Sequence, residues 1–132
     1  MGNVLTRMRE EQLTLRVERD GVLVAASDRV GLKPLQDMSF QRSDLLDGSD
    51  VALPALGLAA AYLLIYGKVG RAFAHTMTKE ARNLFREEGI EFAADSFVRK
   101  LPTAEPLGSF DARAKKAVTL LAFVEELKRA SA

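Results

Sequence analysis

The chain of 132 residues is 48% hydrophobic and 28% charged, the range of one globular domain with a sizeable core. Its 19 basic residues nearly balance 18 acidic ones, so no net field favours nucleic acid, an anionic membrane or a strongly acidic substrate. The absence of cysteine excludes disulfides, thiolate nucleophiles and every zinc site that needs a cysteine. We therefore expect a single domain over residues 1–132, a cytoplasmic location and no cofactor.

The uncharged run 51–66 has the composition of a membrane span without its length. A bilayer core requires roughly 20 apolar residues, whereas this run contains Pro54 near its start and is closed by Gly67 and Lys68. The N-terminus carries Arg7 and Arg9 in place of the apolar core of a secretory signal. We expect a helix buried in a soluble domain and no membrane partner.

The first 26 residues predict a short helix and a β-hairpin. Val4, Leu5 and Met8 among charged neighbours are typical of an amphipathic helix that begins near Asn3. Alternating apolar residues from position 13 then lead to Asp20-Gly21, a turn pair, and to a second apolar strand over residues 22–26.

The middle of the chain alternates strands and helices. Pro34 opens a short helix, and a polar loop fills residues 41–49. A strand over residues 50–53 ends before Pro54, which starts a helix over residues 54–66, because proline cannot continue a central strand. A strand over residues 69–76 follows, and Thr78 caps a helix over residues 79–88 that Gly89 stops.

The C-terminal third is less regular. Ile90 and Phe92 resume a strand, the stretch 93–108 is irregular with a short strand at 98–101, and residues 110–130 repeat apolar positions at helical spacing. Together these elements predict an α/β fold, a three-layer α-β-α arrangement with a mixed sheet, in which an N-terminal β-hairpin is followed by parallel βαβ units.

Two segments carry a family resemblance: Gly57-Leu58-Ala59-Ala60-Ala61 leading to Gly67-Lys68-Val69, and Met77-Thr78 leading through Ala81 to Gly89-Ile90. The sequence around them resembles a bacterial and archaeal family of unknown function, number 1893 in the series of domains of unknown function. The resemblance implies a cytidine-deaminase-like fold. It implies fold more than function, because the matching residues are mainly structural.

The deaminase zinc site is missing from this scaffold. Zinc deaminases place a histidine or cysteine at one helix start and two cysteines at another, with a glutamate as proton shuttle. The matching positions here hold Leu53-Pro54-Ala55 and Met77-Thr78-Lys79-Glu80, and the only histidine is His75. We expect no metal and no zinc-dependent deamination, and the sequence leaves open whether the protein is an enzyme at all.

The candidate ligand-binding residues are His75, Thr76, Thr78 and Arg99. His75 and Thr76 lie near the carboxyl end of a predicted strand, where open α/β sheets bind ligands, and the helix start after Thr78 offers backbone amides to an anion. Structural alternatives remain open for His75 as a hydrogen-bonded or surface histidine and for Thr78 as a plain helix cap. The first hypothesis is therefore a small-molecule binding domain for a nucleoside-like or anionic ligand.

The second hypothesis is a self-association or partner-docking module. Its surface would be the small-residue helix or the apolar face over residues 117–127, and its simplest form is a homodimer. Nucleic acid is disfavoured, because Arg99-Lys100 has no aromatic platform beside it, and Arg113, Lys115 and Lys116 share a polar helix face with acidic residues.

Overall fold

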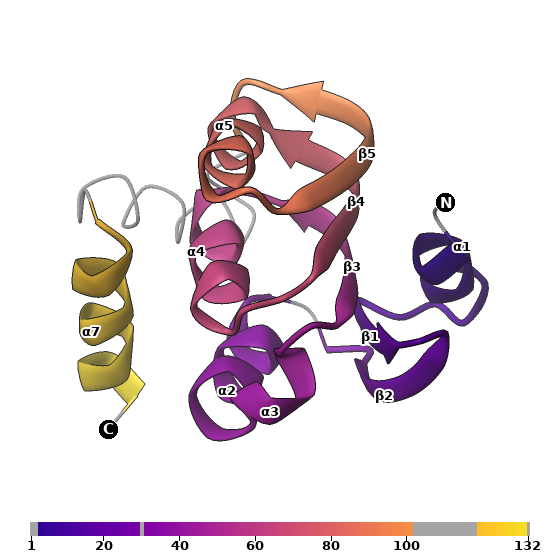
Figure 1. The fold of residues 1–132 in the computed structure, drawn as a ribbon, viewed down its shortest axis with the longest axis horizontal. Helices are drawn as coiled ribbons and strands as arrows, with labels where there is room; N and C mark the ends of the chain where they lie inside the picture. The colour runs from indigo at the N-terminus through magenta and orange to yellow at the C-terminus, as the bar shows by residue number, and fades with distance from the viewer. Residues whose placement is uncertain (1–2, 30, 102–118, 132) are drawn as a thin grey trace.

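The computed structural model describes residues 3–29, 31–101 and 119–131. Five strands form one mixed sheet in the order β2-β1-β3-β4-β5 (Figure 1). Strand β1 (Leu15–Arg19) is antiparallel to β2 (Val22–Ser27) and to β3 (Asp50–Leu56), while β4 (Arg71–Thr78) and β5 (Glu91–Val98) continue the sheet in parallel. The predicted mixed α/β fold with an N-terminal hairpin is confirmed.

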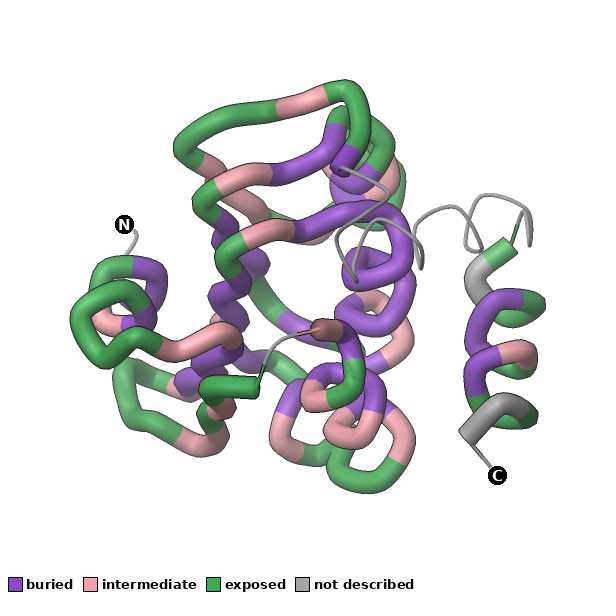
Figure 2. The backbone as a smooth tube through the Cα atoms, turned by 180° about the vertical axis from the view of Figure 1, so that it is seen from behind, coloured by how far each residue is buried: buried purple, intermediate pink, exposed green. Residues whose placement is uncertain are grey.

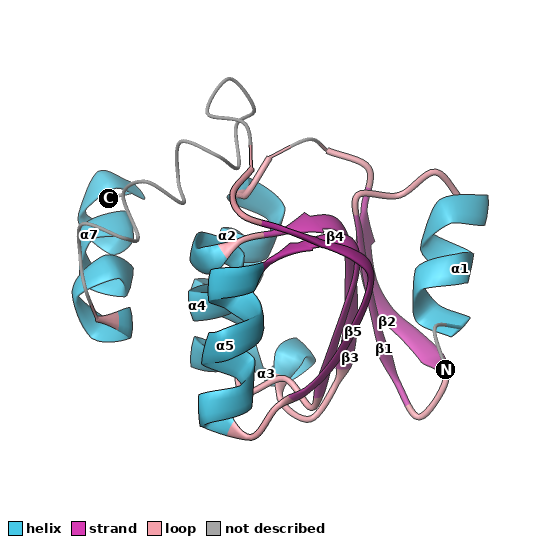
Figure 3. Ribbon diagram, turned by 90° about the horizontal axis from the view of Figure 1, so that it is seen from above, coloured by secondary structure: helices cyan, strands magenta, loops and turns pink. Residues whose placement is uncertain are grey.

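Six helices in the described residues cover the two faces of this sheet unequally (Figure 3). Helix α1 (Asn3–Glu10) lies alone on one face. The other face carries α2 (Lys33–Gln41), α3 (Ser43–Leu46), α4 (Leu58–Tyr66) and α5 (Lys79–Glu88), and α7 (Leu120–Ser131) lies outside α4. Two apolar cores result, a large one on the α4 side and a small one under α1.

Helix α1 is amphipathic, as its sequence predicts. Val4, Leu5 and Met8 are buried against Ala52 of β3 and Phe73 of β4. This contact ties the N-terminal residues to the centre of the sheet.

Helix α4 is buried on nearly every side, which explains its lack of charged residues (Figure 2). Its alanines face the main core, and Tyr62 lies 5.6 Å from the ring of Phe123 in α7, measured between centroids. Phe123 and Leu127 complete that core from outside. The small-residue helix is thus covered within the chain, and of the apolar face predicted over residues 117–127 Phe123, Val124 and Leu127 are buried while Leu121 is exposed. Positions 117 and 118 lie outside the described residues.

The predicted boundary at Pro54 is wrong. Strand β3 continues through Pro54 to Leu56, and the helix begins only at Leu58. Proline is tolerated here because the pairing of β3 with β1 ends at Ala52, so beyond it one side of β3 has no neighbouring strand to which an N–H must donate.

The predicted polar loop over residues 41–49 is wrong too, because it contains helix α3. Leu46 anchors this short helix in the main core with no exposed surface. The guanidinium of Arg19 then donates to the carbonyl oxygens of Asp44, Leu45 and Asp47 at 2.7, 3.3 and 2.8 Å. A long-range contact of this kind leaves no periodic signal in the local sequence.

The predicted short strand over residues 98–101 is wrong, because residues 93–98 extend β5 and only Val98 of that segment is in the strand. Helix α5 and its cap at Gly89, in a left-handed conformation with φ 71°, are confirmed. The predicted C-terminal helix is present as α7, and its first residues, 110–118, lie outside the described residues.

The three parallel strands bend together at one row. Strand pairing joins Leu53 to Ala74 and Ala74 to Ala94, and it resumes two residues later in every strand. In a regular strand, side chains on the same face are an even number of positions apart. Ala74 and Met77 both face the core on the α4 side although they are three positions apart. Consistent with this bend, β4 and β5 curve around the helical layer in Figure 3.

Candidate functional site

A half-open depression of about 540 Å³ lies at the carboxyl edge of the parallel strands. Lys79, Glu80 and Asn83 line it from the first turns of α5, and Arg99 and Lys100 line it from the segment after β5. Ligand sites of open α/β sheets lie at this edge, and the volume is within the range of small-molecule sites.

The charges around this depression are unbalanced. Among the described residues, none of Lys79, Arg99 and Lys100 forms an ion pair with a carboxylate, and Glu80 is the one acidic side chain in the lining. Three cations against one anion leave a local charge of +2 (3 − 1). The partial positive charge of the α5 N-terminus adds to this field. The arrangement is suited to an anion.

Thr78 is both the last residue of β4 and the N-cap of α5. Its hydroxyl oxygen accepts a hydrogen bond from the backbone N–H of Ala81 at 3.2 Å, and the residue is buried. The cap fixes the first turn of α5 and hence the positions of Lys79 and Asn83. Thr78 and Arg99, two of the predicted ligand residues, are therefore brought to the same edge, with the threonine hydroxyl already in use.

His75 lies elsewhere, on the α1 face of the sheet at the strand bend. Its Nδ1 is 2.8 Å from Oδ2 of Asp95 on β5 and 2.6 Å from Nη2 of Arg9 on α1. Arg9 also donates to the same Asp95 oxygen. The pKa of Asp95 is lowered, first by the hydrogen bond from Arg9 and then by that from His75. Thr76, the fourth predicted residue, is partly buried beside His75.

Sequence reasoning overlooked several partners of these residues. Asp95 is 20 positions from His75 along the chain, and only the pairing of β4 with β5 brings them together. The sequence interpretation found no aromatic side chain beside Arg99-Lys100. The structure shows one, Phe97, which is 37% exposed near the end of β5. Strand assignment through Phe97 would have revealed it.

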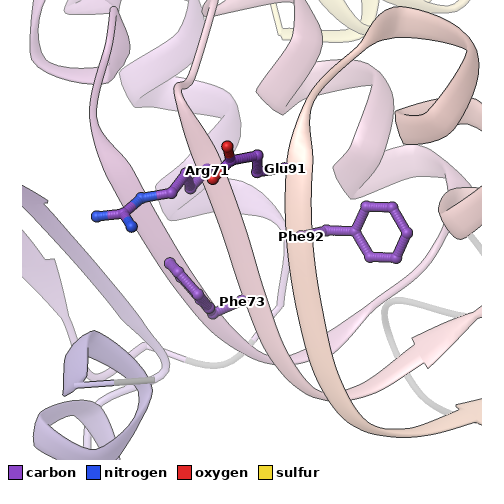
Figure 4. Close-up of a pocket in the computed structure, with 4 residues that line it drawn as sticks. All are labelled: Arg71, Phe73, Glu91 and Phe92. Carbon is purple, nitrogen blue, oxygen red and sulfur yellow. The ribbon is translucent and has the colours of Figure 1, made fainter. Parts of the chain in front are cut away.

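A second depression, of about 380 Å³, is lined by Arg71, Phe73, Glu91 and Phe92 (Figure 4). Phe92 projects away from Arg71 and Phe73 in this view, so the four side chains do not converge. Arg71 is also paired, since its Nε donates to Oδ1 of Asp50 at 2.8 Å and its Nη2 to Oδ2 at 2.5 Å. The depression at the start of α5 is the better candidate.

The two helix starts that the sequence analysis compared with the zinc ligands of deaminases do not offer a full set of zinc ligands. Gly57 and Leu58 begin α4, and the first turn of α5 offers the single carboxylate of Glu80, with no imidazole or thiolate at either helix start. Within the described ranges no three His, Asp or Glu side chains are grouped as metal ligands. In the same ranges no helix is both long and apolar enough to cross a membrane.

The fold and this edge define a mixed α/β domain with a cationic depression beside a capped helix. The chain belongs to the family described as Domain of unknown function (DUF1893), which matches residues 3–102, so the resemblance drawn from the glycine-flanked segments is confirmed. The crystal structure of a DUF1893 family protein from Thermotoga maritima is similar, with a TM-score of 0.83 and 22% identity. That match covers 96% of this chain and 86% of the other and shows the fold alone. No curated protein matches.

Proposed function

We propose that this protein binds a small anionic ligand in the depression at the start of α5. The observation that carries the proposal is the group of three cations, Lys79, Arg99 and Lys100, that line one depression without carboxylate partners among the described residues. Like charges held together repel one another, and a bound anion relieves that repulsion while accepting their hydrogen bonds.

The ligand's contacts follow from the chemistry of the lining. Arg99 presents a planar fork of donors suited to a phosphate or carboxylate, and the two lysines supply compact charges. The side-chain amide of Asn83 can donate or accept and so serves a neutral polar group of the ligand. Thr78 acts indirectly, by holding the first turn of α5 in place.

A ligand-dependent rise in melting temperature tests this function. We expect inorganic phosphate and ribose 5-phosphate at millimolar concentration to raise the melting temperature of the full chain at constant ionic strength, because a ligand that binds only the folded state stabilises it. Arg99→Gln and Lys79→Gln should each reduce the shift. Arg129→Gln, an exposed position on α7, removes the same charge elsewhere and should leave the shift unchanged. Equal shifts in all three variants would contradict the proposal.

The finer fold type and the cellular location are also part of this proposal. A cytidine-deaminase-like arrangement is supported by the sequence resemblance and by the hairpin followed by parallel strand–helix–strand units. On that scaffold the ligand is nucleoside-like or simply anionic, and the starts of α4 and α5 offer a zinc ion the Glu80 carboxylate but no imidazole or thiolate. A cytoplasmic location and a single domain over residues 1–132 stay predictions from composition.

A further inference from the structure

An aromatic ring lies near the cationic depression. Phe97 of β5 is one of the few large apolar side chains that are exposed, at 37%, and its ring makes an edge contact with Phe92 at 6.4 Å between centroids. The guanidinium carbon of Arg82 in α5 lies 5.4 Å from the Phe97 centroid. Leaving an aromatic ring partly in water forgoes burial that would stabilise the fold.

Arg82 is itself incompletely satisfied. Its Nε is buried and has no hydrogen-bond acceptor among the described residues, and no carboxylate there pairs with its guanidinium. A buried donor without an acceptor costs free energy and calls for an explanation. Its position over Phe97 shows that the cation is held against a ring rather than against an acid.

Helix geometry joins this ring to the depression. Lys79, Arg82 and Asn83 are separated by three and four positions, so they share one face of α5. Lys79 and Asn83 line the depression while Arg82 lies over Phe97. On the strand side of the depression, Phe97 of β5 is only two residues before Arg99. An aromatic surface and an anion site are therefore neighbours.

We infer that the ligand carries a planar aromatic group linked to its anionic group, the class to which mononucleotides belong. This inference rests on the proposed function, because the anion is placed among Lys79, Arg99 and Lys100. The aromatic group stacks at Phe97 and Arg82, where base stacking and cation–π attraction add to the electrostatic binding. A depression of about 540 Å³ is of a size for one such molecule.

Two ligands that share a phosphate and differ in the aromatic group separate the two proposals. Calorimetric titration of the full chain with ribose 5-phosphate and with adenosine 5′-monophosphate should give a roughly 5- to 100-fold tighter dissociation constant for the nucleotide. Equal affinities in the unmodified protein would overturn this inference and leave the anion site standing. Binding of neither compound would overturn both.

A leucine variant removes the ring while keeping an apolar side chain. Phe97→Leu should abolish the preference for the nucleotide and leave the affinity for ribose 5-phosphate unchanged, and Arg82→Gln should reduce the preference as an independent check. Phe40→Leu is the matched control, because Phe40 also lies under a cation, Lys128, at 5.4 Å, and does not line the depression. A nucleotide preference that survives Phe97→Leu would overturn the inference.

Discussion

His75 of β4 and Asp95 of β5 face one another across neighbouring parallel strands, with Nδ1 of the imidazole 2.8 Å from Oδ2 of the carboxylate. They share a row with Pro54 of β3, between the paired positions on either side, and at this row the three strands bend. Arg9, near the end of α1, donates to the same carboxylate. A polar contact thus joins α1 to the bend, beside its apolar contact with the sheet.

Arg9→Gln should raise the pKa of Asp95 toward its ordinary value. The hydrogen bond from Arg9 is the largest cause that lowers this pKa, and the one from His75 is second, so His75→Gln should raise it less. Carboxyl carbon shifts followed by NMR through an acid titration measure both changes. A larger rise in the histidine variant would contradict the assignment. Global stability should hardly change, because these side chains are exposed and solvent screens them.

Glu18→Gln should lower the free energy of unfolding by about 3 kcal/mol, because it removes a buried carboxylate that pairs with two arginines and leaves the buried Arg16 only the exposed Glu11 as a charged partner among the described residues. The Glu18 side chain is 2% exposed and accepts hydrogen bonds from Arg7 and, at 2.6 Å, from the 7% exposed Arg16. Urea unfolding measures the loss. Glu11→Gln is the control, since this 51% exposed carboxylate also pairs with Arg16 and its removal should cost less than about 1 kcal/mol.

Acidification should act through the same carboxylate. The pKa of Glu18 is lowered, chiefly by the hydrogen bond from Arg7, while burial opposes the shift. A group whose pKa is lower in the folded state stabilises the fold above its unfolded pKa of about 4.3 and loses that contribution as the pH falls through the folded pKa. Unfolding free energies of the unmodified protein should therefore fall below about pH 4.3 more steeply than those of Glu18→Gln. Parallel curves would refute this.

Thr78→Ala should cost about 1 kcal/mol of stability, the usual loss when a helix N-cap is removed. The hydroxyl oxygen that accepts from the Ala81 N–H is lost, whereas Thr78→Ser keeps it and should restore most of the stability. Thermal unfolding measures both variants. Because the hydroxyl holds the first turn of α5 and does not itself face the ligand, phosphate should bind folded Thr78→Ala more weakly but measurably, and Thr78→Ser nearly as well as the unmodified protein. A complete loss of binding would instead make Thr78 a direct ligand residue.

Phe123→Ala should destabilise the protein by about 3–5 kcal/mol, the range for a large aromatic side chain removed from a core. Phe123 has no exposed surface and contacts Tyr62 of α4, so α7 is a structural part of the main core. Chemical denaturation measures the change. Leu121→Ala, at a 66% exposed position on the same helix, should stay within about 0.5 kcal/mol. Similar small effects at both positions would show that α7 contributes little.

Local sequence signals predicted the elements whose causes are local. The Asp20-Gly21 turn, the Thr78 cap and the left-handed Gly89 each depend on a few neighbouring residues, and each is found as expected. The predicted boundary between β3 and α4 was wrong at Pro54. Whether a strand tolerates proline there depends on where its pairing with β1 ends, and local sequence does not reveal that.

The candidate site likewise has features that the local sequence predicted and features that only the tertiary structure revealed. The sequence by itself determined the hairpin, the alternation of strand and helix, and the cap at Thr78, because turn chemistry and hydrophobic period act between near neighbours. Only the tertiary structure decided that His75 meets Arg9 and Asp95, and that Phe97 and Arg82 lie near Lys79 and Arg99. Those contacts come from strand pairing and helix packing between residues far apart in the sequence. The order of residues along the chain does not show which of them lie close together in space.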